Sequence, residues 1–521
     1  MQNRLIAEEV SYNVKEMKVE HDKLYSNLNV EQQRVYDSVI NNVNSKKGGI
    51  FFVHRSGGCG KTFLWKTLIF HLRSEKKIVL HVASSGIAAV LLPGGRTTHS
   101  RFLIPLDSDE YTIAGICHGT DIAELLQYTS LIIWDEAPMQ NRYAFESIDR
   151  CFRDIMSAID SSNCYKPFGG ITMVFGGDFR QILHVVPKGT RADIVNIAFN
   201  RSKLWIFCEL HILKQNMRLH AGNSEAENKE IEKFSNWVLD IGNGKLPNLN
   251  SDSPECDADI EIPEEFLVHA DTDPIDEIIK VTYPNLLENF RSSQYLKEKA
   301  ILTPTNVVVD DINTRVLDKL PGKTYTYIST DVIIDPPSGD DDVEASIPVE
   351  YLNSLNMSGI PKHNLVLKEG SVVMLLRNLS QINGLSNGTR MIVKKCNKNT
   401  VECQILCGGH VGTTHLIPRI YMVPSDKKWP VQFTRRQLPL QICFAMTINK
   451  SQGQSLETVG LYLPTSIFTH GQLYVVVSRV TSNKGLHILI CSERGGTTNI
   501  TKNIVYEEVL YNLQYVNVLI G

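Results

Sequence analysis

The sequence lacks a run of about 18 apolar residues, the shortest stretch that usually crosses a bilayer as a helix. Its first twenty residues also lack the apolar core of a secretory signal and carry four glutamates, unlike acid-poor transit peptides. We therefore expect a protein without membrane spans or a membrane partner, located in the nucleus or, alternatively, in the cytosol.

Paired cysteines are also missing. The eleven cysteines include no C-x-x-C pair and their number is odd, which favours reduced thiols in an intracellular protein. Cys403, Cys407 and His410 come closest to a metal cluster, but they lack a fourth ligand at zinc spacing. We therefore predict neither a structural disulfide nor a zinc site.

The sequence has no excess of positive charge. Its formal net charge is −4, so a nucleic-acid partner would need a local basic groove. With 42% hydrophobic and 21% charged residues, and no tandem repeat, the composition is that of a globular protein. A length of 521 residues exceeds what one core usually supports, which predicts two or more domains.

Short apolar runs alternate with helical patterns in the first half of the chain. Each has roughly four to eight residues and ends at a turn, as buried parallel strands do. The runs are residues 50–53, 78–83, 131–137, 171–178 and 204–213. This order predicts a doubly wound α/β domain whose ligand lies at the carboxyl ends of its strands.

The second half is organised differently. Residues 225–299 are more helical and acidic, and an exposed linker is expected over 248–265. A further acidic segment, 333–345, predicts a loop. Between residues 368 and 440, short apolar runs separated by glycine turns predict a small β-barrel inserted before a final α/β segment.

The segment HRSGGCGKT, residues 54–62, follows the first apolar run and precedes a helical pattern. Glycines let the backbone approach a phosphate closely, and amides at a helix N-terminus bind the anion. The candidates are Gly57, Gly58 and Gly60 for this cradle, Lys61 for the β and γ phosphates, and Thr62 for Mg²⁺.

One position departs from the phosphate-loop pattern G-x-x-x-x-G-K-[ST], because Arg55 stands where the first glycine is expected. If that position needs φ > 0, an L-residue costs about 1–2 kcal/mol and could lower ATP affinity roughly tenfold. If φ is negative, the backbone cost nearly vanishes and the side chain can point into solvent. We expect the second case, in which nucleotide binding survives.

Two adjacent carboxylates, Asp135 and Glu136, end the apolar run IIWDE. At the carboxyl end of a strand, Asp135 would hold hydrated Mg²⁺ and Glu136 would act as general base. The alternative is a buried strand capped by two solvated acids. Together with the upstream phosphate loop, the pair favours ATP hydrolysis.

A third apolar run ends in GGDFRQ, residues 176–181. Gln181 could hydrogen-bond the γ-phosphate or the nucleophilic water and so sense hydrolysis. The alternative is a plain β-turn, for which G-G-D is a good sequence.

These segments belong to a longer ordered series. It consists of LNVEQQ (28–33), GGCGKT (57–62), SSGIAA (84–89), GGRTTHS (94–100), DEAP (135–138), GGDFRQ (176–181), LKQNMR (213–218), LTPTN (302–306), DDIN (310–313), MLLRN (374–378), GLSNGTR (384–390), TINKSQGQS (447–455) and GQLYVVVSR (471–479). The series resembles a superfamily 1B DNA helicase of the petite-integration-frequency type, related to RecD. It is particularly similar to plant proteins with a helicase domain like that of Helitron transposons, and the resemblance covers about residues 28–496.

The resemblance implies two RecA-like, doubly wound motor domains with an inserted SH3-like β-barrel. The expected parts are an N-terminal extension (1–27), motor domain 1 (28–212) with a small wedge insertion near 101–120, the first part of motor domain 2 (213–367), the barrel (368–440) and the remainder of motor domain 2 (441–521).

The resemblance also implies roles around the nucleotide. Gln32 would read the adenine edge, although adjacent Gln33 leaves the register open. Arg218 and Arg479, from the second motor domain, would stabilise transition-state charge as arginine fingers, the alternative for each being a surface ion pair. The implied ATP-binding residues are Gln32, Gly57, Gly58, Cys59, Gly60, Lys61, Thr62, Phe63, Gly453 and Gln454, with Thr62 and Asp135 for Mg²⁺.

For single-stranded DNA, the resemblance implies a groove across both motor domains with contacts mainly to phosphate and sugar. The candidates are Thr98, His99 and Ser100 in the first domain and Thr303, Thr305, Asn306, Thr447, Asn449 and Lys450 in the second. For any one of the hydroxyl residues the alternative is a helix cap, and for His99 the alternative is a packed histidine.

We therefore expect a DNA helicase dependent on ATP and Mg²⁺, monomeric when free, that binds single-stranded DNA and 5′-tailed duplexes. Its 5′-to-3′ polarity and its roles in DNA repair, recombination and telomere maintenance are implied by the resemblance alone. Two alternatives stay open: a catalytically weakened, transposon-derived DNA-binding remnant, because of Arg55, and a phosphate-loop ATPase acting on protein or RNA.

Overall fold

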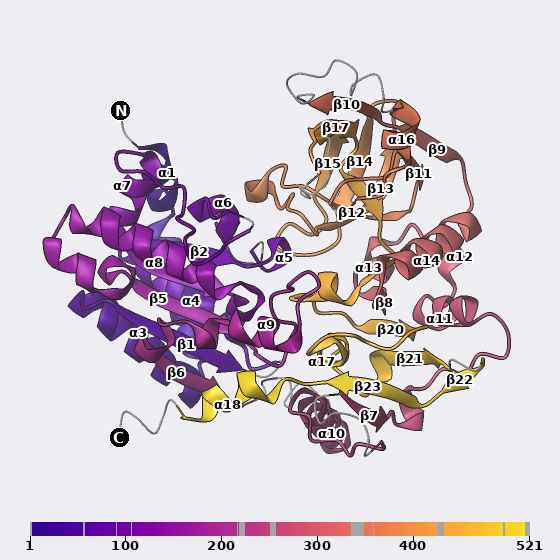
Figure 1. Cartoon of the computed structure of the whole chain (residues 1–521), viewed down its shortest axis with the longest axis horizontal. Coiled ribbons are helices and arrows are strands. Elements are labelled where there is room, and N and C mark those ends of the chain that lie inside the picture. Colours follow the sequence, from indigo (N-terminus) through magenta and orange to yellow (C-terminus); the bar gives the residue numbers. More distant parts are fainter. Residues whose placement is uncertain are drawn as a thin grey trace. The chain divides into compact units, whose positions relative to one another are not determined.

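The computed structural model describes residues 3–55, 58–89, 91–105, 107–215, 217, 224–250, 257–334, 348–357, 359–424, 432–492 and 495–515 (Figure 1). The chain forms two compact units. Unit 1 comprises Met1–Ile262, Ser466–Asn483 and Ile500–Gly521, and unit 2 comprises Pro263–Thr465 and Lys484–Asn499. Each contains a largely parallel sheet with helices, so the predicted α/β fold is confirmed.

Unit 1 is centred on a six-stranded parallel sheet with the order β3-β2-β4-β5-β1-β6. Its strands are β1 (Gly49–Arg55), β2 (Ile78–Ala83), β3 (Arg96–Thr97), β4 (Thr129–Asp135), β5 (Thr172–Gly177) and β6 (Cys208–Leu213). Each except the short β3 coincides with a predicted apolar run. Because the strands are parallel, their carboxyl ends meet at one edge of the sheet.

Helices cover both faces of this sheet. Phe51 packs with α3 (Val30–Ser45) and α4 (Lys61–Ser74) on one face, whereas its neighbour Phe52 packs with α7 (Asp121–Gln127) and α8 (Arg142–Ser157) on the other, as the period of two in a strand requires. The helices of unit 1 are α1 (Arg4–Val10), α2 (Val14–Tyr25), α3 (Val30–Ser45), α4 (Lys61–Ser74), α5 (Gly86–Ala89), α6 (Thr98–Phe102), α7 (Asp121–Gln127), α8 (Arg142–Ser157), α9 (Arg191–Asn196), α10 (Glu225–Gly242), α17 (Gln472–Val477) and α18 (Glu507–Tyr515).

The acidic stretch 248–265 is only partly a linker. Residues 251–256 lie outside the described part, but β7 (Asp257–Glu261) pairs antiparallel with β23 (Ile500–Ile504). Ile260 is buried between acidic neighbours, so the acidic composition concealed an alternating strand pattern. The prediction of an exposed linker is wrong for this strand.

Unit 2 contains a five-stranded sheet with the order β19-β8-β20-β21-β22, in which only the β21–β22 pair is antiparallel. The strands are β8 (Lys299–Thr303), β19 (Ala445–Thr447), β20 (Thr458–Leu463), β21 (Leu486–Cys491) and β22 (Thr497–Thr498). The helices of this unit are α11 (Pro274–Thr282), α12 (Leu286–Asn289), α13 (Ser293–Lys297), α14 (Asn306–Lys319) and α16 (Val349–Ser354). In neither unit is a described helix both long and apolar enough to cross a membrane.

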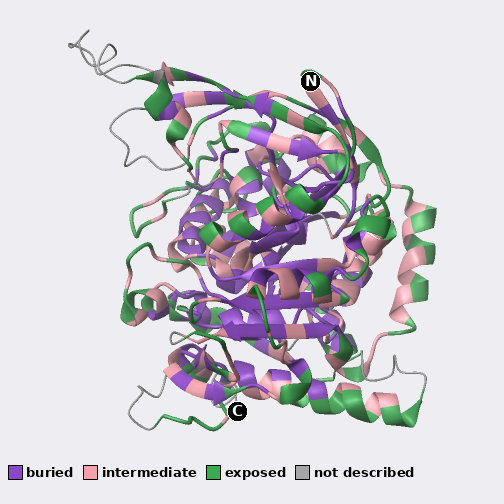
Figure 2. Cartoon of the chain, turned by 90° about the vertical axis from the view of Figure 1, so that its right-hand side faces the viewer, coloured by how far each residue is buried: buried purple, intermediate pink, exposed green. Residues whose placement is uncertain are grey.

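Antiparallel sheets complete unit 2. The largest, β15-β14-β13-β12-β18, consists of β12 (Val372–Leu375), β13 (Arg390–Cys396), β14 (Thr400–Ile405), β15 (Thr414–Pro418) and β18 (Leu440–Ile442) around its own apolar core. Two smaller sheets pair β9 (Thr324–Ile328) with β11 (Asn364–Lys368), and β17 (Gln432–Gln437) with β10 (Thr330–Ile334) and β16 (Ile420–Met422). Figure 2 shows the central strands as largely buried, whereas most residues of β9, β10 and β15 are exposed or half-buried. Of the predicted acidic loop 333–345, the first two residues belong to β10, and 335–345 lie outside the described residues.

A buried ion pair fixes the segment around α16. Arg435 of β17 and Asp331 of β10 both have 0% side-chain exposure, and Arg435 Nη2 lies 2.7 Å from Asp331 Oδ2. The guanidinium also donates to the backbone carbonyls of Leu352, Leu355 and Pro361 at 2.7–3.1 Å. One side chain therefore anchors three backbone carbonyls between α16 and Pro361.

Arg435→Leu should destabilise this part of unit 2 by about 3–5 kcal/mol, because it leaves the Asp331 carboxylate buried without its partner. Arg436→Leu is the matched control: Arg436 is exposed and stacks on Tyr421, so its loss should cost about 0.5–1 kcal/mol. Urea unfolding and amide hydrogen exchange over residues 348–357 would measure both. Equal effects of the two variants would contradict this account.

Candidate functional site

The candidate phosphate loop joins β1 to α4. Arg55 is the last residue of β1 and pairs with Leu213 of β6, so its backbone is extended rather than left-handed. The missing first glycine therefore costs no left-handed strain. Ser56 and Gly57 lie outside the described residues.

The described glycines of the loop have the conformation that only glycine adopts freely. Gly58 has φ +89° and Gly60 φ +71°, and a Cβ on Gly60 would lie 2.6 Å from Gln32 Nε2. Gly60 is the N-cap of α4, whose first-turn amides lack intrahelical acceptors. Thr62 and Phe63 are half-buried in that turn. This geometry suits an anion at the helix N-terminus.

Gln32 connects the loop to α3. Its Nε2 donates to the Cys59 carbonyl at 3.2 Å, and its Oε1 accepts the Asn29 backbone N–H at 3.1 Å, as part of a capping box. Gln33 is exposed and contacts Tyr25 instead. Of the two glutamines, Gln32 thus lies at the loop, and its reading of adenine stays a prediction.

Lys61 forms a buried ionic cluster with the two carboxylates that end β4. Its side chain is 1% exposed, and its Nζ is paired with Asp135 and, at 3.3 Å, with Glu136. Both carboxylates are buried as well. Burial removes these three charged groups from water, which is unfavourable unless they are paired with one another or with a bound ion.

Glu136 is held in a strained conformation. Its φ of +53° and ψ of +41° are left-handed, which costs a non-glycine residue about 1–3 kcal/mol. The Glu136 backbone N–H donates to Asp135 Oδ1 at 2.9 Å, which helps to hold the turn. Such strain concentrates at functional sites, and it sets the direction in which this carboxylate leaves the strand.

Gln181 lies in a turn after β5 and is buried. Its backbone N–H donates to the Asp178 carbonyl at 3.1 Å, so the β-turn that was the alternative is present. Within the described residues, however, its side-chain Oε1 has no hydrogen-bond partner. A buried acceptor in this state is available to a ligand or to water.

Sequence reasoning gave no role to Asp178, which anchors a segment from the far end of the chain. Its Oδ2 accepts the Tyr474 hydroxyl of α17 at 2.6 Å, and its Oδ1 accepts Arg180 Nη1 at 3.2 Å. Burial raises the pKa of Asp178, but Arg180, His54 and the Tyr474 hydroxyl outweigh burial and lower it below its usual range. Neither motif alone indicates this contact, because its partners are distant in sequence.

A histidine completes this anchor. His470 Nε2 donates to the Phe179 carbonyl at 2.7 Å, and His470 Nδ1 accepts the Tyr506 N–H at 2.9 Å. Next to it Gly471, with φ +74°, lies so close that a Cβ would be 2.7 Å from the Gln181 carbonyl carbon. The start of α17 is thus seated directly on the Gln181 turn.

The two candidate arginine fingers differ in what can be described. Arg479 is buried after α17, where its Nε donates to the Val475 carbonyl at 2.8 Å, and it belongs to unit 1 together with the phosphate loop. Arg218 lies outside the described residues. Their catalytic roles stay predictions.

The first three residues of α6, Thr98, His99 and Ser100, are the first group of candidate DNA contacts. Thr98 is buried and its Oγ1 has no hydrogen-bond partner among the described residues. His99 is half-buried with its Nε2 3.2 Å from Gln140 Nε2, and burial, followed by nearby His184, lowers its pKa. Ser100 is exposed.

The second group lies in unit 2 at the carboxyl ends of β8 and β19. Thr303 and Thr447 are register partners on these parallel strands, and buried Thr303 Oγ1 has no partner within the described part of the chain. Thr305 is the N-cap of α14 but makes no side-chain cap bond, and Asn306 beside it is exposed. The sheet therefore brings two of the candidate segments together.

The segment after β19 completes this group. Asn449 and Lys450 are half-buried in the 3-10 helix Ile448–Ser451. Gly453 follows with φ +83°, and Gln454 Nε2 donates to the Lys450 carbonyl at 3.1 Å. Gly453 and Gln454 thus lie in unit 2 next to the DNA candidates, as a coupling role requires, and their contact with nucleotide stays a prediction.

Two protein-family models match this chain, and one of them contains the site. The family model described as PIF1-like helicase matches residues 27–252, and that described as DNA helicase Pif1, 2B domain, matches residues 350–395. Residues 27–252 and 350–395 of this chain are thus similar to PIF1-like helicases. The first match contains the phosphate loop, the carboxylate pair and Gln181, and the predicted superfamily 1B resemblance is confirmed.

Curated relatives carry the same family name. The ATP-dependent DNA helicase PIF1 of Homo sapiens is 27% identical over 489 residues, which cover 89% of this chain and 60% of the human protein. The ATP-dependent DNA helicase RRM3 of Saccharomyces cerevisiae is 24% identical over 495 residues, covering 89% of this chain and 65% of the yeast protein. This PIF1-like chain thus spans less than two thirds of the length of these relatives.

Solved structures share the fold. A Bacteroides Pif1 helicase in complex with ADP-AlF3 and ssDNA has a TM-score of 0.64 and 22% identity, with 95% of this chain and 98% of that chain covered. The Pif1 helicase of Candida albicans has a TM-score of 0.60 and 22% identity, with 94% and 99% covered. The α/β motor fold of the PIF1-like family is thereby supported over nearly the whole chain.

Acidification should loosen the α17 anchor. Burial lowers the pKa of His470 to about 4, so between pH 6.5 and 4 the unfolded chain takes up a proton that the folded chain does not. Above pH 6.5 His470 is neutral in both states and does not change the free energy of unfolding. As the pH decreases from 6.5 towards 4, the free energy of unfolding falls by roughly 3 kcal/mol at most. His470→Gln should make urea unfolding less dependent on pH over this range. An unchanged slope in His470→Gln would exclude this histidine as the source.

Proposed function

We propose that this chain is an ATP-dependent DNA helicase that couples ATP hydrolysis to 5′-to-3′ translocation on single-stranded DNA and to duplex unwinding. The observation that carries the proposal is the buried cluster of Lys61, Asp135 and Glu136 beside a left-handed glycine loop. The names of the human and yeast relatives, both ATP-dependent DNA helicases, support the same activity.

The residues present suit ATP with Mg²⁺. Gly58 and Gly60 hold the loop in left-handed conformations at the N-terminus of α4, where the first-turn amides would meet phosphates, and Lys61 begins the same helix. Thr62 and Asp135 would hold the metal. No group of three His, Cys, Asp or Glu side chains gathers as a metal site in the described ranges, so phosphate and water oxygens would complete the coordination, as is usual for Mg²⁺. Bound ATP supplies the phosphoanhydride bond whose hydrolysis drives movement.

The protein side chains then have distinct tasks. Glu136, fixed in its left-handed conformation, takes the proton of the attacking water, and the Gln181 Oε1 acceptor orients that water. Arg479 and Arg218 balance the negative charge that develops during hydrolysis. The Asp178–Tyr474 contact links the Gln181 turn to α17, the helix that precedes Arg479.

Single-stranded DNA would be held through its phosphates. Thr98 in unit 1 and Thr303 in unit 2 each offer a buried hydroxyl that lacks a partner among the described residues, and a phosphate oxygen would satisfy it. Such contacts read no base, which predicts little sequence preference. A related Bacteroides Pif1 has been solved bound to ssDNA.

Strand separation would depend on the segment between α6 and α7. Tyr111 and Ile113 are 81% and 66% exposed, whereas Ala114 beside them packs into the core. Asp109 fixes the turn through hydrogen bonds to Thr112 Oγ1 and the Tyr111 N–H. A fixed apolar tip of this kind can enter between stacked bases at a duplex junction.

The wider context follows from the family. We assign the protein to DNA repair, recombination and telomere maintenance in the nucleus, working as a monomer when free on 5′-tailed duplexes. One related structure concerns DNA unwinding at forked dsDNA by two coordinating Pif1 helicases. The Helitron-like assignment and the domain boundaries given above are part of the same proposal.

Lys61→Ala should lower DNA-stimulated ATP hydrolysis at least about a hundredfold, because it removes the buried charge at the phosphates. Lys66→Ala, in the same helix but not buried, should stay near the wild type. Arg55→Gly should change the rate less than about threefold, because the Arg55 backbone is already extended. Steady-state ATPase assays with single-stranded DNA, RNA or no polymer would measure all four proteins.

The same assay separates the alternatives. A wild-type rate no higher than that of Lys61→Ala would overturn the ATPase assignment, and recovery in Arg55→Gly would place the defect at Arg55. Stimulation of ATP hydrolysis by RNA but not by DNA would instead indicate a phosphate-loop ATPase that acts on RNA.

The double variant Tyr111→Ala, Ile113→Ala should lower the rate of single-turnover unwinding of a 5′-tailed duplex about tenfold, because the apolar tip is lost. ATP hydrolysis on single-stranded DNA should change less than about twofold, since the tip is remote from the phosphate loop in sequence and touches no strand phosphate in this scheme. Tyr165→Ala, another exposed tyrosine of unit 1, is the control. A wild-type protein that binds the tail without separating strands would be the DNA-binding remnant.

A further inference from the structure

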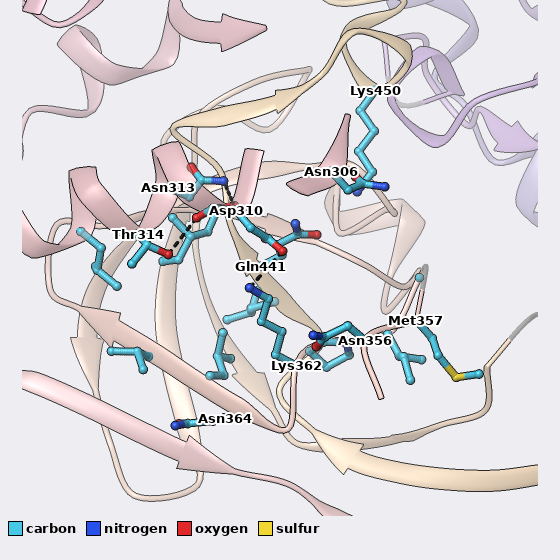
Figure 3. A pocket seen from close by; sticks show the side chains of 18 of the residues that line it. Asn306, Asp310, Asn313, Thr314, Asn356, Met357, Lys362, Asn364, Gln441 and Lys450 are labelled. Carbon is cyan, nitrogen blue, oxygen red and sulfur yellow. Dashed lines mark hydrogen bonds and ion pairs between the residues drawn. The ribbon is translucent and has the colours of Figure 1, made fainter. Parts of the chain in front are cut away.

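Unit 2 contains a pocket of about 320 Å³ next to its candidate DNA contacts (Figure 3). One wall is α14, a second is the segment from residue 356 to β11, and β18 supplies the third. Its volume and mixed apolar and polar lining are those of a small-molecule site. The ion pair between Arg435 and Asp331 described above holds the backbone at Leu355 and Pro361, so this second wall is fixed in place.

The rim of the pocket coincides with the candidate strand contacts. Asn306 and Lys450 line this pocket and also a smaller one beside it. Figure 3 shows the two side chains next to each other at one end of the group. A phosphate bound to Lys450 would therefore place its own nucleotide at the mouth.

The interior suits a flat heterocycle better than a phosphate. Leu317, Ile360 and Leu365 provide apolar surface, while Asp310 and Gln441 provide groups that can pair with a base edge. Asp310 is paired with Lys362 at 3.0 Å, and a phosphate inside would meet the carboxylates of Asp310 and Asp318. The charge pattern thus keeps a phosphate at the rim and admits an uncharged ring.

One wall residue is already fully engaged. Asn313 donates to the carbonyls of Ile442 and Ala445 at 3.0 Å and accepts the N–H groups of Phe444 and Ala445 at 2.8–2.9 Å. It ties α14 to the backbone between β18 and β19, so the pocket keeps its shape when empty. Gln441, on β18, lies in the middle of the group in Figure 3.

We propose that this pocket receives one nucleobase of the bound single strand, turned out of the strand while its phosphate stays on Asn306 and Lys450. The inference rests on the proposed binding of single-stranded DNA. It goes beyond that function, because a base held in a pocket fixes the register of the strand on unit 2, whereas phosphate contacts alone leave the strand free to slide.

The test uses the full chain and an adenine-rich single strand that carries one 2-aminopurine at each position in turn. This base is quenched by stacking in the free strand, and the lining residues that the structure describes include no aromatic ring to quench it again. One position should brighten several-fold on binding and become protected from acrylamide, while its neighbours do not. Fluorescence anisotropy of an end-labelled strand measures binding independently.

Gln441→Trp fills the pocket and should abolish the brightening at that position. Val332→Trp, at a 53% exposed strand position outside the pocket, is the matched control and should behave as the wild type. An abasic site at the responding position should weaken binding to the wild type about tenfold, and should weaken binding to Gln441→Trp hardly at all. If Gln441→Trp unfolds at a lower temperature than the control, Met357→Trp, from the other wall, takes its place.

The outcomes separate this inference from the function on which it rests. Two results would contradict the binding of a base in the pocket and leave the helicase proposal intact. One is strand binding without increased fluorescence at any position, and the other is an equal loss of affinity for the abasic strand in the wild type and in Gln441→Trp. Saturable binding of free 2-aminopurine deoxyriboside with no response from the strand would mark a small-molecule site and also overturn it. An absence of strand binding by anisotropy would overturn both.

Discussion

The buried ion pairs of Lys61 determine how the rest of unit 1 is arranged. The lysine begins α4 after β1, its carboxylate partners end β4, and β5 runs between those two strands. The lysine stem must therefore pass over β5, and a Cβ on Gly176 there would lie 2.9 Å from Lys61 Cδ. A glycine in the middle strand is thus part of the ionic site, although it carries no chemistry itself. The next residues of β5 lead to Asp178 and Gln181, so the same strand that admits the lysine also carries the turn on which α17 rests.

Unpartnered hydroxyls give the strand contacts a common physical character. Sequence alone could not separate a threonine that caps a helix from one that binds a phosphate, since both tasks use the same short oxygen. In the folded chain the N-cap of α6 is Thr97 and that of α14 is Thr305, and neither side chain forms a cap bond. Among the candidate threonines of these two segments, the buried hydroxyls without a partner in the described residues belong instead to Thr98 and Thr303. Burial without a partner is costly, which is why these two positions suit a ligand better than a structural role.

Local patterns predicted a large share of the fold and the centre of the site. Apolar runs of the right length marked five strands of the first sheet, and the adjacent carboxylates were placed correctly because a strand end fixes where its last residues emerge. The structure also answered the question raised by Arg55, since pairing with Leu213 requires an extended backbone that no local rule could guarantee. The contacts of Asp178 with Tyr474 and of His470 with Phe179 were not predictable, because they join segments far apart in sequence. The strand β7 was missed for a different reason: its burial depends on pairing with β23, while its composition is acidic.

Unit 1 is not continuous in the chain, and this has a consequence for its synthesis. Its first part ends at Ile262, but the α17 segment that covers Asp178 begins only at Ser466, and β23 follows at Ile500. At about 5–20 residues per second, the ribosome releases that covering segment roughly 10 to 40 seconds after the first part. During this interval Asp178 and Arg180 lack their native cover, and β7 lacks the strand that it pairs with. A chain that stops before Ser466 would therefore have a damaged site, although the ionic centre at Lys61, Asp135 and Glu136 had been translated long before.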